Sequence, residues 1–336
     1  MKNIITLLIG SIFIIYCNRK HEGFIMTVSG EIQSDKLGRS LIHEHITTDF
    51  IGAEKVAQPQ YNIDSAYNTI LPFLIKLKQQ GVKSFFECTP NYIGRDVKLL
   101  KRLSEVSGIN IITNTGYYAA VDKKYLPKHV YEESIEQLAQ RWRNEWRNGI
   151  DGTEIKPGFI KLGVGEGALD SIETKLILAA IKVHKQTGLT IAIHTGNGEA
   201  ALSEYELFKN QGISGENLIW VHAQNGKAEQ HINLAKKGVW LSFDGVNEPK
   251  IMEYVTYLKN MKAEGLLSRI LISHDDGWSV ENEKEKIKLV PFNNGNRIPY
   301  TTIFDGFIKA LEKEGFTKKE IDTILIENPG EAFEIK

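Results

Sequence analysis

The chain has 336 residues, of which 42% are hydrophobic and 25% are charged, as is typical of a soluble globular protein. The formal net charge is −1, so no large basic excess predicts a nucleic-acid partner. Composition therefore excludes a basic nucleic-acid-binding protein and leaves the function to be read from motifs.

The first twenty residues differ from the rest of the chain. A short positive start containing Lys2 precedes an uncharged, mostly apolar run at 4–16, which is too short to span a bilayer and suits the core of a secretory signal. Cys17 follows directly, as in a bacterial lipoprotein cleavage box, although Tyr16 is larger than the small residue usual there. We expect 1–17 to be a signal or lipoprotein segment. The protein would then be exported, either periplasmic or anchored in the membrane through a lipid on Cys17, with ordinary secretion and an uncleaved anchor as alternatives.

From residue 26 onward, short apolar runs alternate with longer helical patterns, which favours parallel strands connected by helices. The expected strands are 40–46, 82–88, 110–115, 158–162, 190–195, 218–222, 239–244 and 269–274. The expected helices include 64–80, 131–147, 171–186, 200–210 and 227–237. Eight such units predict an α/β fold, a (β/α)8 TIM barrel over 26–336, with a short N-terminal β-hairpin segment at 27–37.

Two histidines one residue apart, His43 and His45, are the most informative pattern. Residues i and i+2 of a strand point to the same face, so both rings could hold one metal ion. Further polar residues lie at or just past the C-terminal ends of later strands: Lys161, His194, His222 and Asp275. Active sites of this fold lie at that end of the barrel. Satisfied core histidines are the alternative, and Asp276 is a rival to Asp275.

Three or four histidines with a carboxylate suit zinc, with manganese, cobalt or iron as the other candidates. Lys161 needs a separate explanation, because a buried ammonium beside metal cations is unfavourable. A carbamate formed from the lysine and CO2 would be anionic and could bridge two metals. Cys88 is interpreted as a small buried core residue.

These motifs together resemble the phosphotriesterase family of the amidohydrolase superfamily, which includes phosphotriesterase-like lactonases and phosphotriesterase-related proteins. The resemblance covers about 26–336 and includes Thr27-Val28-Ser29-Gly30, the His-Glu-His strand, Ile93-Gly94-Arg95-Asp96, Ile160-Lys161, Ser273-His274-Asp275 and Glu327-Asn328-Pro329. It implies a binuclear centre and suggests a homodimer. His43, His45 and Asp275 would hold the more buried ion and His194 and His222 the more exposed ion, with carbamylated Lys161 and a hydroxide as bridges. Asp275 would take the proton.

Departures from the family pattern concern the substrate. Asn225 replaces a carboxylate of the pesticide-degrading phosphotriesterases, and Gly245 follows Asp244 where those enzymes have histidine and lactonases often have arginine. We expect Tyr92, Tyr117 and Trp278 to line the substrate pocket, with Tyr118 as a further candidate. The segment 277–299 is expected to be a loop or lid over the site.

The main hypothesis is therefore a metal-dependent hydrolase of a carboxylic ester, lactone or amide, acting on a small molecule. The alternative within the same class is a phosphotriester hydrolase that resembles aryldialkylphosphatases and acts slowly and promiscuously. A rival from another class is a non-catalytic lipoprotein that uses the barrel to bind a ligand.

Overall fold

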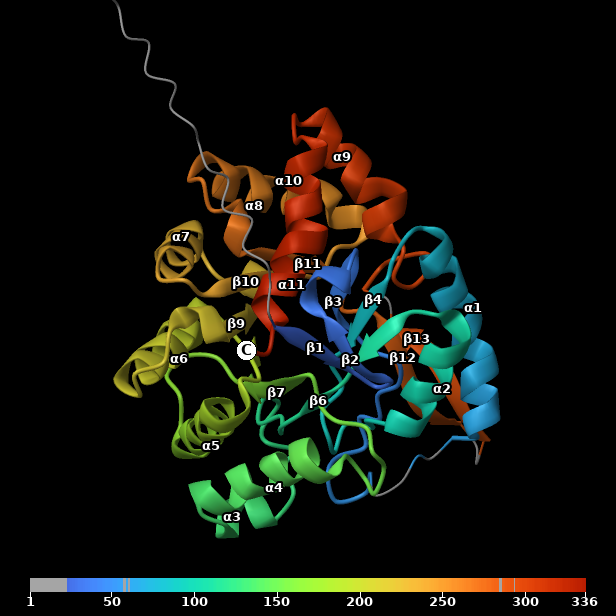
Figure 1. Ribbon diagram of the computed structural model, residues 1–336, viewed down its shortest axis with the longest axis vertical. Coiled ribbons are helices and arrows are strands. Elements are labelled where there is room, and N and C mark those ends of the chain that lie inside the picture. Colours follow the sequence, from blue (N-terminus) through green and yellow to red (C-terminus); the bar gives the residue numbers. More distant parts are fainter. Residues whose placement is uncertain (1–22, 57–58, 60, 284–285, 293) are drawn as a thin grey trace, which may run out of the picture.

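Parallel strands form the centre of the computed structural model, which describes residues 23–56, 59, 61–283, 286–292 and 294–336 (Figure 1). The central strands are β3 (Ser40–Glu44), β4 (Ser84–Glu87), β5 (Asn110–Ile112), β6 (Asn114–Thr115), β7 (Phe159–Val164), β8 (Ile191–Thr195), β9 (Leu218–Val221), β10 (Trp240–Asp244) and β11 (Ile270–Ser273). All eight predicted strands are present, with the third divided into β5 and β6.

Two arcs of strands close into a barrel. One arc has the order β3-β4-β5 and the other runs from β6 through to β11. β5 and β6 join the arcs, because only Thr113 separates them. The opposite seam between β3 and β11 is closed by the His43 amide, which donates to Ser273 Oγ at 3.0 Å, and the Asp275 amide, which donates to His43 O at 3.1 Å. The predicted α/β barrel is confirmed.

Helices surround the strands (Figure 1). They are α1 (Ile63–Gln79), α2 (Val97–Ser107), α3 (His129–Glu132), α4 (Ile135–Asn148), α5 (Ser171–Thr187), α6 (Gly198–Asn210), α7 (Ala228–Lys236), α8 (Ile251–Ala263), α9 (Ile308–Lys313), α10 (Lys318–Asp322) and α11 (Asn328–Phe333). Their ends follow local chemistry. Asp170 caps α5 by accepting from two backbone amides, and Gly188 ends that helix with the positive φ that glycine tolerates. Within the described part of the chain, no helix has the length and apolar character needed to cross a bilayer.

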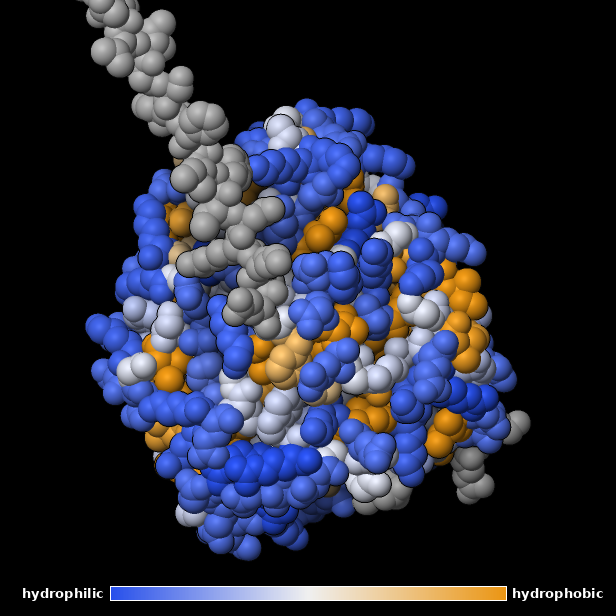
Figure 2. Space-filling view, in the orientation of Figure 1, coloured by the Kyte–Doolittle hydropathy of each residue, from blue (hydrophilic) through white to orange (hydrophobic). Residues whose placement is uncertain are grey.

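A short antiparallel hairpin, β1 (Phe24–Thr27) and β2 (Gly30–Gln33), lies at the base of the barrel, close to the predicted position. Phe24 also pairs with Ile335, so the hairpin and the chain's C-terminal residues lie side by side (Figure 1). The same face in Figure 2 is mostly hydrophilic, with hydrophobic residues in separate patches. Inside the barrel near this end, Phe86 packs against Phe333 with ring centroids 4.1 Å apart. The barrel is therefore filled by side chains at its base.

A second hairpin corrects the prediction for 277–299. Instead of a loop, the segment contains the antiparallel strands β12 (Gly277–Glu283) and β13 (Lys286–Phe292). The segment after β3 holds this hairpin in place: the Thr48 amide donates to Trp278 O and the Val280 amide donates to Thr48 O, both at 2.8 Å. Such pairing between distant segments leaves no local signal in the sequence.

Glu44 holds the barrel seam beneath the predicted ligands. Its side chain is completely buried and accepts from the backbone amides of His274 and Asp276, both at 2.9 Å. It also accepts from Ser273 Oγ at 2.8 Å and lies 2.7 Å from His274 Nδ1. Glu44 therefore fixes the turn that carries Asp275 and has a structural role.

Replacing Glu44 by Gln should lower the free energy of unfolding by about 2–4 kcal/mol, because an amide group would leave some of these buried donors without an acceptor. Urea denaturation followed by circular dichroism measures the change. The control is Glu31→Gln, which removes an exposed carboxylate on β2 and should change the value by less than about 0.5 kcal/mol. Equal midpoints for the two variants would contradict this role of Glu44.

Candidate metal centre

A cavity of about 250 Å³ lies at the C-terminal ends of the barrel strands. All six side chains that were predicted as metal ligands line it: His43, His45, Lys161, His194, His222 and Asp275. His43, Lys161 and His194 belong to β3, β7 and β8. His45 and His222 directly follow β3 and β9, and Asp275 lies two residues after β11. The fold therefore brings together distant residues such as His45 and Asp275, which are 230 positions apart in the sequence.

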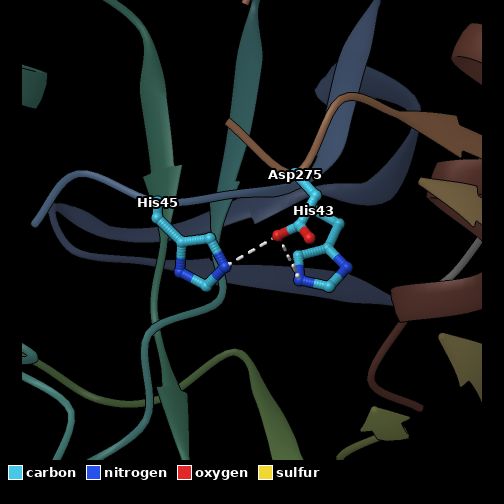
Figure 3. Close-up of side chains that lie close together, drawn as sticks. All are labelled: His43, His45 and Asp275. Atoms are coloured by element: carbon cyan, nitrogen blue, oxygen red, sulfur yellow. Dashed lines mark hydrogen bonds and ion pairs between the residues drawn. The ribbon is translucent and has the colours of Figure 1, made fainter. Parts of the chain in front are cut away.

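His43, His45 and Asp275 form one close group (Figure 3). Asp275 Oδ1 lies 3.1 Å from His45 Nε2 and 3.4 Å from His43 Nε2. Possible ligand atoms of the three side chains all lie within 4.8 Å of one another. This spacing suits coordination of a single divalent ion.

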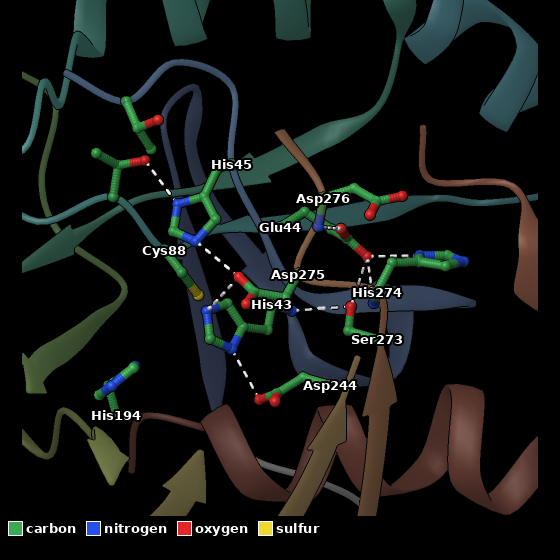
Figure 4. Close-up of polar contacts among 12 residues, drawn as sticks. His43, Glu44, His45, Cys88, His194, Asp244, Ser273, His274, Asp275 and Asp276 are labelled. Atoms are coloured by element: carbon green, nitrogen blue, oxygen red, sulfur yellow. Dashed lines mark hydrogen bonds and ion pairs between the residues drawn. The ribbon is translucent and has the colours of Figure 1, made fainter. Parts of the chain in front are cut away.

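Asp244 was missed as a functional residue from the sequence, although it ends a strand in the same way as the predicted ligands. It is completely buried at the end of β10 and contacts two histidines, of which Figure 4 shows His43. Its Oδ2 lies 2.8 Å from His43 Nδ1, and its Oδ1 lies 2.6 Å from His222 Nδ1. A carboxylate on Nδ1 orients each ring so that Nε2 is left for a metal.

The other two histidines also have fixed orientations. His45 Nδ1 lies 2.8 Å from Thr89 Oγ1, which again leaves Nε2 toward Asp275. His194 Nε2 lies 3.0 Å from the Tyr118 hydroxyl. The His194 and His222 rings are neighbours, with centroids 4.4 Å apart. The contact with Tyr118 uses Nε2 of His194, which leaves Nδ1 as the nitrogen of this ring for a metal.

Two of the predicted ligands occupy an uncommon backbone conformation. His222 has φ 63° and Asp275 has φ 60°, in the left-handed region that residues other than glycine seldom adopt. His222 directly follows β9 and Asp275 lies two residues after β11, and both side chains line the cavity. Strain of this kind collects at functional sites, where the surrounding contacts maintain it.

Burial and the Asp244 contacts determine the protonation of the cluster. Burial lowers the pKa of His43 to about 4 and, with the neighbouring His222 and Lys161, keeps the pKa of His194 well below its usual value. Burial alone would raise the pKa of Asp244, but His222 and His43 hold it well below its usual range. His43 and His194 are therefore neutral near pH 7, which is the form that binds metals.

Lys161 has few interactions that could stabilise a charge. It is 2% exposed, and its Nζ donates only to the backbone oxygen of the adjacent Leu162, at 3.2 Å. Among the described residues, no carboxylate forms an ion pair with it. Burial accordingly lowers its pKa. A buried amine without an anionic partner fits the carbamate that the sequence suggested, because a neutral amine is the form that reacts with CO2.

Neighbouring polar residues point elsewhere. Asp276, the rival to Asp275, accepts from the Tyr300 amide at 2.9 Å and from Asn296. Arg95 forms an ion pair with Glu145 and donates to a backbone oxygen. None of these side chains lines the cavity.

The three aromatic residues predicted to line the pocket do not line this cavity. Tyr117 is buried against Trp142, with ring centroids 5.2 Å apart. Tyr92 has φ 70° and packs against Tyr117 beside a separate cavity. Trp278 packs against Phe73 of α1. The neighbouring Tyr118 lines the cavity in place of Tyr117, because successive residues of extended backbone point to opposite sides.

Other loop residues, not foreseen from the sequence, complete the cavity wall. They are Thr48, Phe50, Pro90, Ile93, Val121, Tyr125 and Phe292. Cys88 also lines the wall, is 2% exposed and donates weakly to Ile42 O. Most of these side chains are apolar, so the polar ligand candidates lie at one end of a mainly apolar pocket.

The geometry agrees with comparisons to known proteins. The chain matches the phosphotriesterase family over residues 23–333. It belongs to that family. It is 28% identical to a phosphotriesterase homology protein of Escherichia coli, over 89% of this chain and 99% of the relative. An aryldialkylphosphatase of Saccharolobus solfataricus is also 28% identical, over 90% and 96%. An N-acetyltaurine hydrolase of Xenopus tropicalis is 25% identical, over 91% and 97%.

A solved structure described as "Molecular Engineering of Organophosphate Hydrolysis Activity from a Weak Promiscuous Lactonase Template" has a TM-score of 0.81 and 25% identity, over 92% of this chain and 99% of that chain. The chain is thus a hydrolase of the phosphotriesterase family with His and Asp groups able to hold metal.

The prediction of export is wrong. It depended on 1–17 and on Cys17, which lie outside the described residues, and the family match begins only at residue 23. The relatives in Escherichia coli and mycobacteria are phosphotriesterase homology proteins that are not shown to be exported. Neither a periplasmic location nor a lipid anchor is therefore assigned.

Replacing Asp244 by Asn should weaken metal binding about 10–100-fold, because one amide cannot accept from both His43 and His222. Competition with a chelator during metal titration measures the affinity. The control is Asp64→Asn, which removes an exposed carboxylate on α1 and should leave the affinity unchanged. Unchanged affinity in Asp244→Asn would show that this carboxylate does not orient the ligands.

Proposed function

We propose that this protein is a binuclear-metal-dependent hydrolase that cleaves a carboxylic ester, a lactone or an amide, within a barrel domain that spans 26–336. The observation that carries the proposal is the convergence of four histidines, Lys161 and Asp275 on one cavity. The positions of Asp244 and Thr89, which occupy Nδ1 of three of these rings, support it. A homodimer remains a prediction from the family resemblance.

His43, His45 and Asp275 would hold one ion, and His194 and His222 the other, with carbamylated Lys161 between them. Zinc is the expected metal, with manganese, cobalt or iron as alternatives, because imidazole and carboxylate ligands suit all four. Two such ions lower the pKa of bound water and polarise the oxygen of the scissile group.

The residues of the chain supply position and proton transfer. Burial alone would raise the pKa of Asp275, but the neighbouring His43 and the hydrogen bond from His45 hold it below its usual value. Asp275 is therefore ionised near neutral pH and can accept a proton from the attacking water. The Tyr118 hydroxyl is at the cavity wall beside His194 and could bind the substrate's oxygen. The apolar wall excludes bulk water from the reaction.

Phosphotriester hydrolysis is the second candidate. It is supported by the similarity to the aryldialkylphosphatase of Saccharolobus solfataricus. The apolar cavity would also accept an aryl ester of phosphate. Gly245, which replaces the histidine of efficient phosphotriesterases, makes this the weaker activity.

Purified protein loaded with zinc in the presence of bicarbonate should hold two ions per chain, and Lys161→Ala should hold one or none because the bridging ligand is lost. Elemental analysis after removal of free metal measures the ratio. Lys313→Ala, an exposed lysine on α9, is the control and should keep both ions. The metal proposal fails if the wild type holds fewer than two ions and Lys161→Ala leaves binding unchanged.

A panel of a lactone, an N-acyl amide and a dialkyl aryl phosphate should give the highest kcat/KM for one of the two carbonyl substrates. Asp275→Asn should lower kcat by about 10²–10⁴-fold, as expected for the loss of a proton acceptor. Asp64→Asn should match the wild type. If the aryl phosphate is the best substrate, the second candidate replaces the first, and an Asp275→Asn variant with full activity would remove Asp275 from the reaction.

A further inference from the structure

Three aromatic side chains from two loops and the second hairpin line the cavity. Phe50 follows β3, Tyr125 belongs to the loop between β6 and α3, and Phe292 ends β13. The Phe50 ring lies 6.2 Å from Tyr125 and 6.0 Å from Phe292 between centroids, and Phe292 lies 5.7 Å from His45. We call Phe50, Tyr125 and Phe292 the aromatic clamp. It connects the metal-ligand candidates to the outside.

Two apolar residues on this rim are exposed. Phe50 is 43% exposed and Val121 is 58% exposed, and both line the cavity. Exposed apolar residues that continue an internal apolar wall mark a binding surface. The cavity itself, at about 250 Å³, is smaller than the roughly 300–1,000 Å³ of usual ligand pockets. A substrate larger than the cavity therefore has to extend past the clamp or through another side.

A second opening lies on the other side of His194. A groove of about 530 Å³ is lined by His194 itself, by Asn225 and by Glu166 and Asp122, and we call it the polar groove. Both carboxylates are exposed and have no ion-pair partner among the described residues. Lys123 is the one cation among the described residues that line the groove, and it is already paired with Asp170.

The wall between the two spaces is a strained turn. Val121, Asp122 and Lys123 are consecutive residues with φ 57°, 53° and 60°, and Val121 lines both the cavity and the polar groove. A β-branched residue at positive φ is energetically costly. The Lys123 ion pair with Asp170 and the hydrogen bond from the Ala53 amide to Lys124 O hold this turn between neighbouring loops.

The two spaces differ in charge and meet at the proposed centre. We propose that the substrate has two arms, one on each side of the scissile bond: an apolar acyl chain in the aromatic clamp, and a leaving group that is neutral or cationic, but not anionic, in the polar groove. This inference rests on the proposed hydrolase function. It predicts that this chain prefers other substrates than the one named for its relative, the N-acetyltaurine hydrolase. The leaving group of N-acetyltaurine is taurine, which carries an anionic sulfonate.

A matched set of amides and esters tests both arms. Hexanoyl and acetyl groups would each be joined to taurine, to butylamine and to N,N-dimethylethylenediamine, with the corresponding esters of isethionate, butanol and choline. Burial of one methylene is worth about fourfold, so the hexanoyl compounds should exceed the acetyl compounds at least tenfold in kcat/KM. Because Asp122 and Glu166 repel a negative charge, kcat/KM for substrates with an anionic leaving group should be at least about tenfold lower than for those with a neutral one.

Two variants address the arms separately. Phe292→Ala should lower the ratio of kcat/KM for hexanoyl over acetyl compounds about tenfold, mainly by raising KM for the hexanoyl compounds. Its control is Ile287→Ala, because Ile287 lies at an alternate position of β13 and faces away from the Phe292 side. The double variant Asp122→Asn with Glu166→Gln should raise kcat/KM for the anionic substrates about fivefold relative to kcat/KM for the neutral ones. Its control, Glu312→Gln on α9, should leave this ratio unchanged.

Equal or better turnover of the anionic substrates, or an equal loss for acetyl and hexanoyl compounds in Phe292→Ala, would overturn the inference. Ketone analogues of the three hexanoyl amides cannot be hydrolysed. Calorimetric titration of the zinc-loaded protein with these analogues measures the order of the three binding affinities without turnover. If no ester or amide is cleaved but the analogues bind in the expected order, the proposed reaction fails and the two arms stand. If the analogues bind without this order, the two arms fail.

Discussion

The buried carboxylate of Asp244 is the contact on which the rest of the candidate centre depends. It lies at the end of β10 and contacts Nδ1 of His43 and of His222, two residues that come from different parts of the barrel. Each contact fixes a ring that would otherwise rotate and lowers the pKa of Asp244 against the effect of burial. The resulting network is costly to disturb, because in a buried site each unpaired polar group loses its solvation without compensation.

The barrel seam supplies the second constraint. Glu44 and Ser273 tie β3 to the turn after β11, and Asp275 then leaves the strand in a left-handed conformation. The same seam therefore determines how far Asp275 lies from His43 and His45. Structural residues that never reach the cavity control the geometry of those that do, so a substitution at Glu44 would affect both stability and the arrangement of the site.

Much of the barrel and its ligand candidates could be predicted from the sequence, because both leave periodic local signals. The apolar runs gave the strands, and polar residues at their C-terminal ends gave the six side chains that line the cavity. The same signal was present for Asp244, but its role depends on two distant histidines. The sequence could not show which of Tyr117 and Tyr118 lines the cavity either. That depends on the bridge between Tyr118 and Gly163, which are distant in the sequence.

The pocket wall could not be predicted for a related reason. Phe50, Tyr125 and Phe292 come from loops and a hairpin whose pairing with the segment after β3 has no local pattern. Trp278 pairs with Pro291 whereas Phe292 pairs with Gly277, so the two aromatic residues lie on opposite faces of one hairpin. A shift of one residue in that register would have exchanged them.

The central claim is that these six side chains hold two metal ions with a modified lysine between them. A crystal structure of the zinc-loaded protein, grown with bicarbonate and recorded at the zinc absorption edge, tests it most directly. The account predicts two anomalous peaks per chain, one beside His43, His45 and Asp275 and one beside His194 and His222, with a carbamate on Lys161 between them. A single peak or none, with an unmodified Lys161, would contradict it.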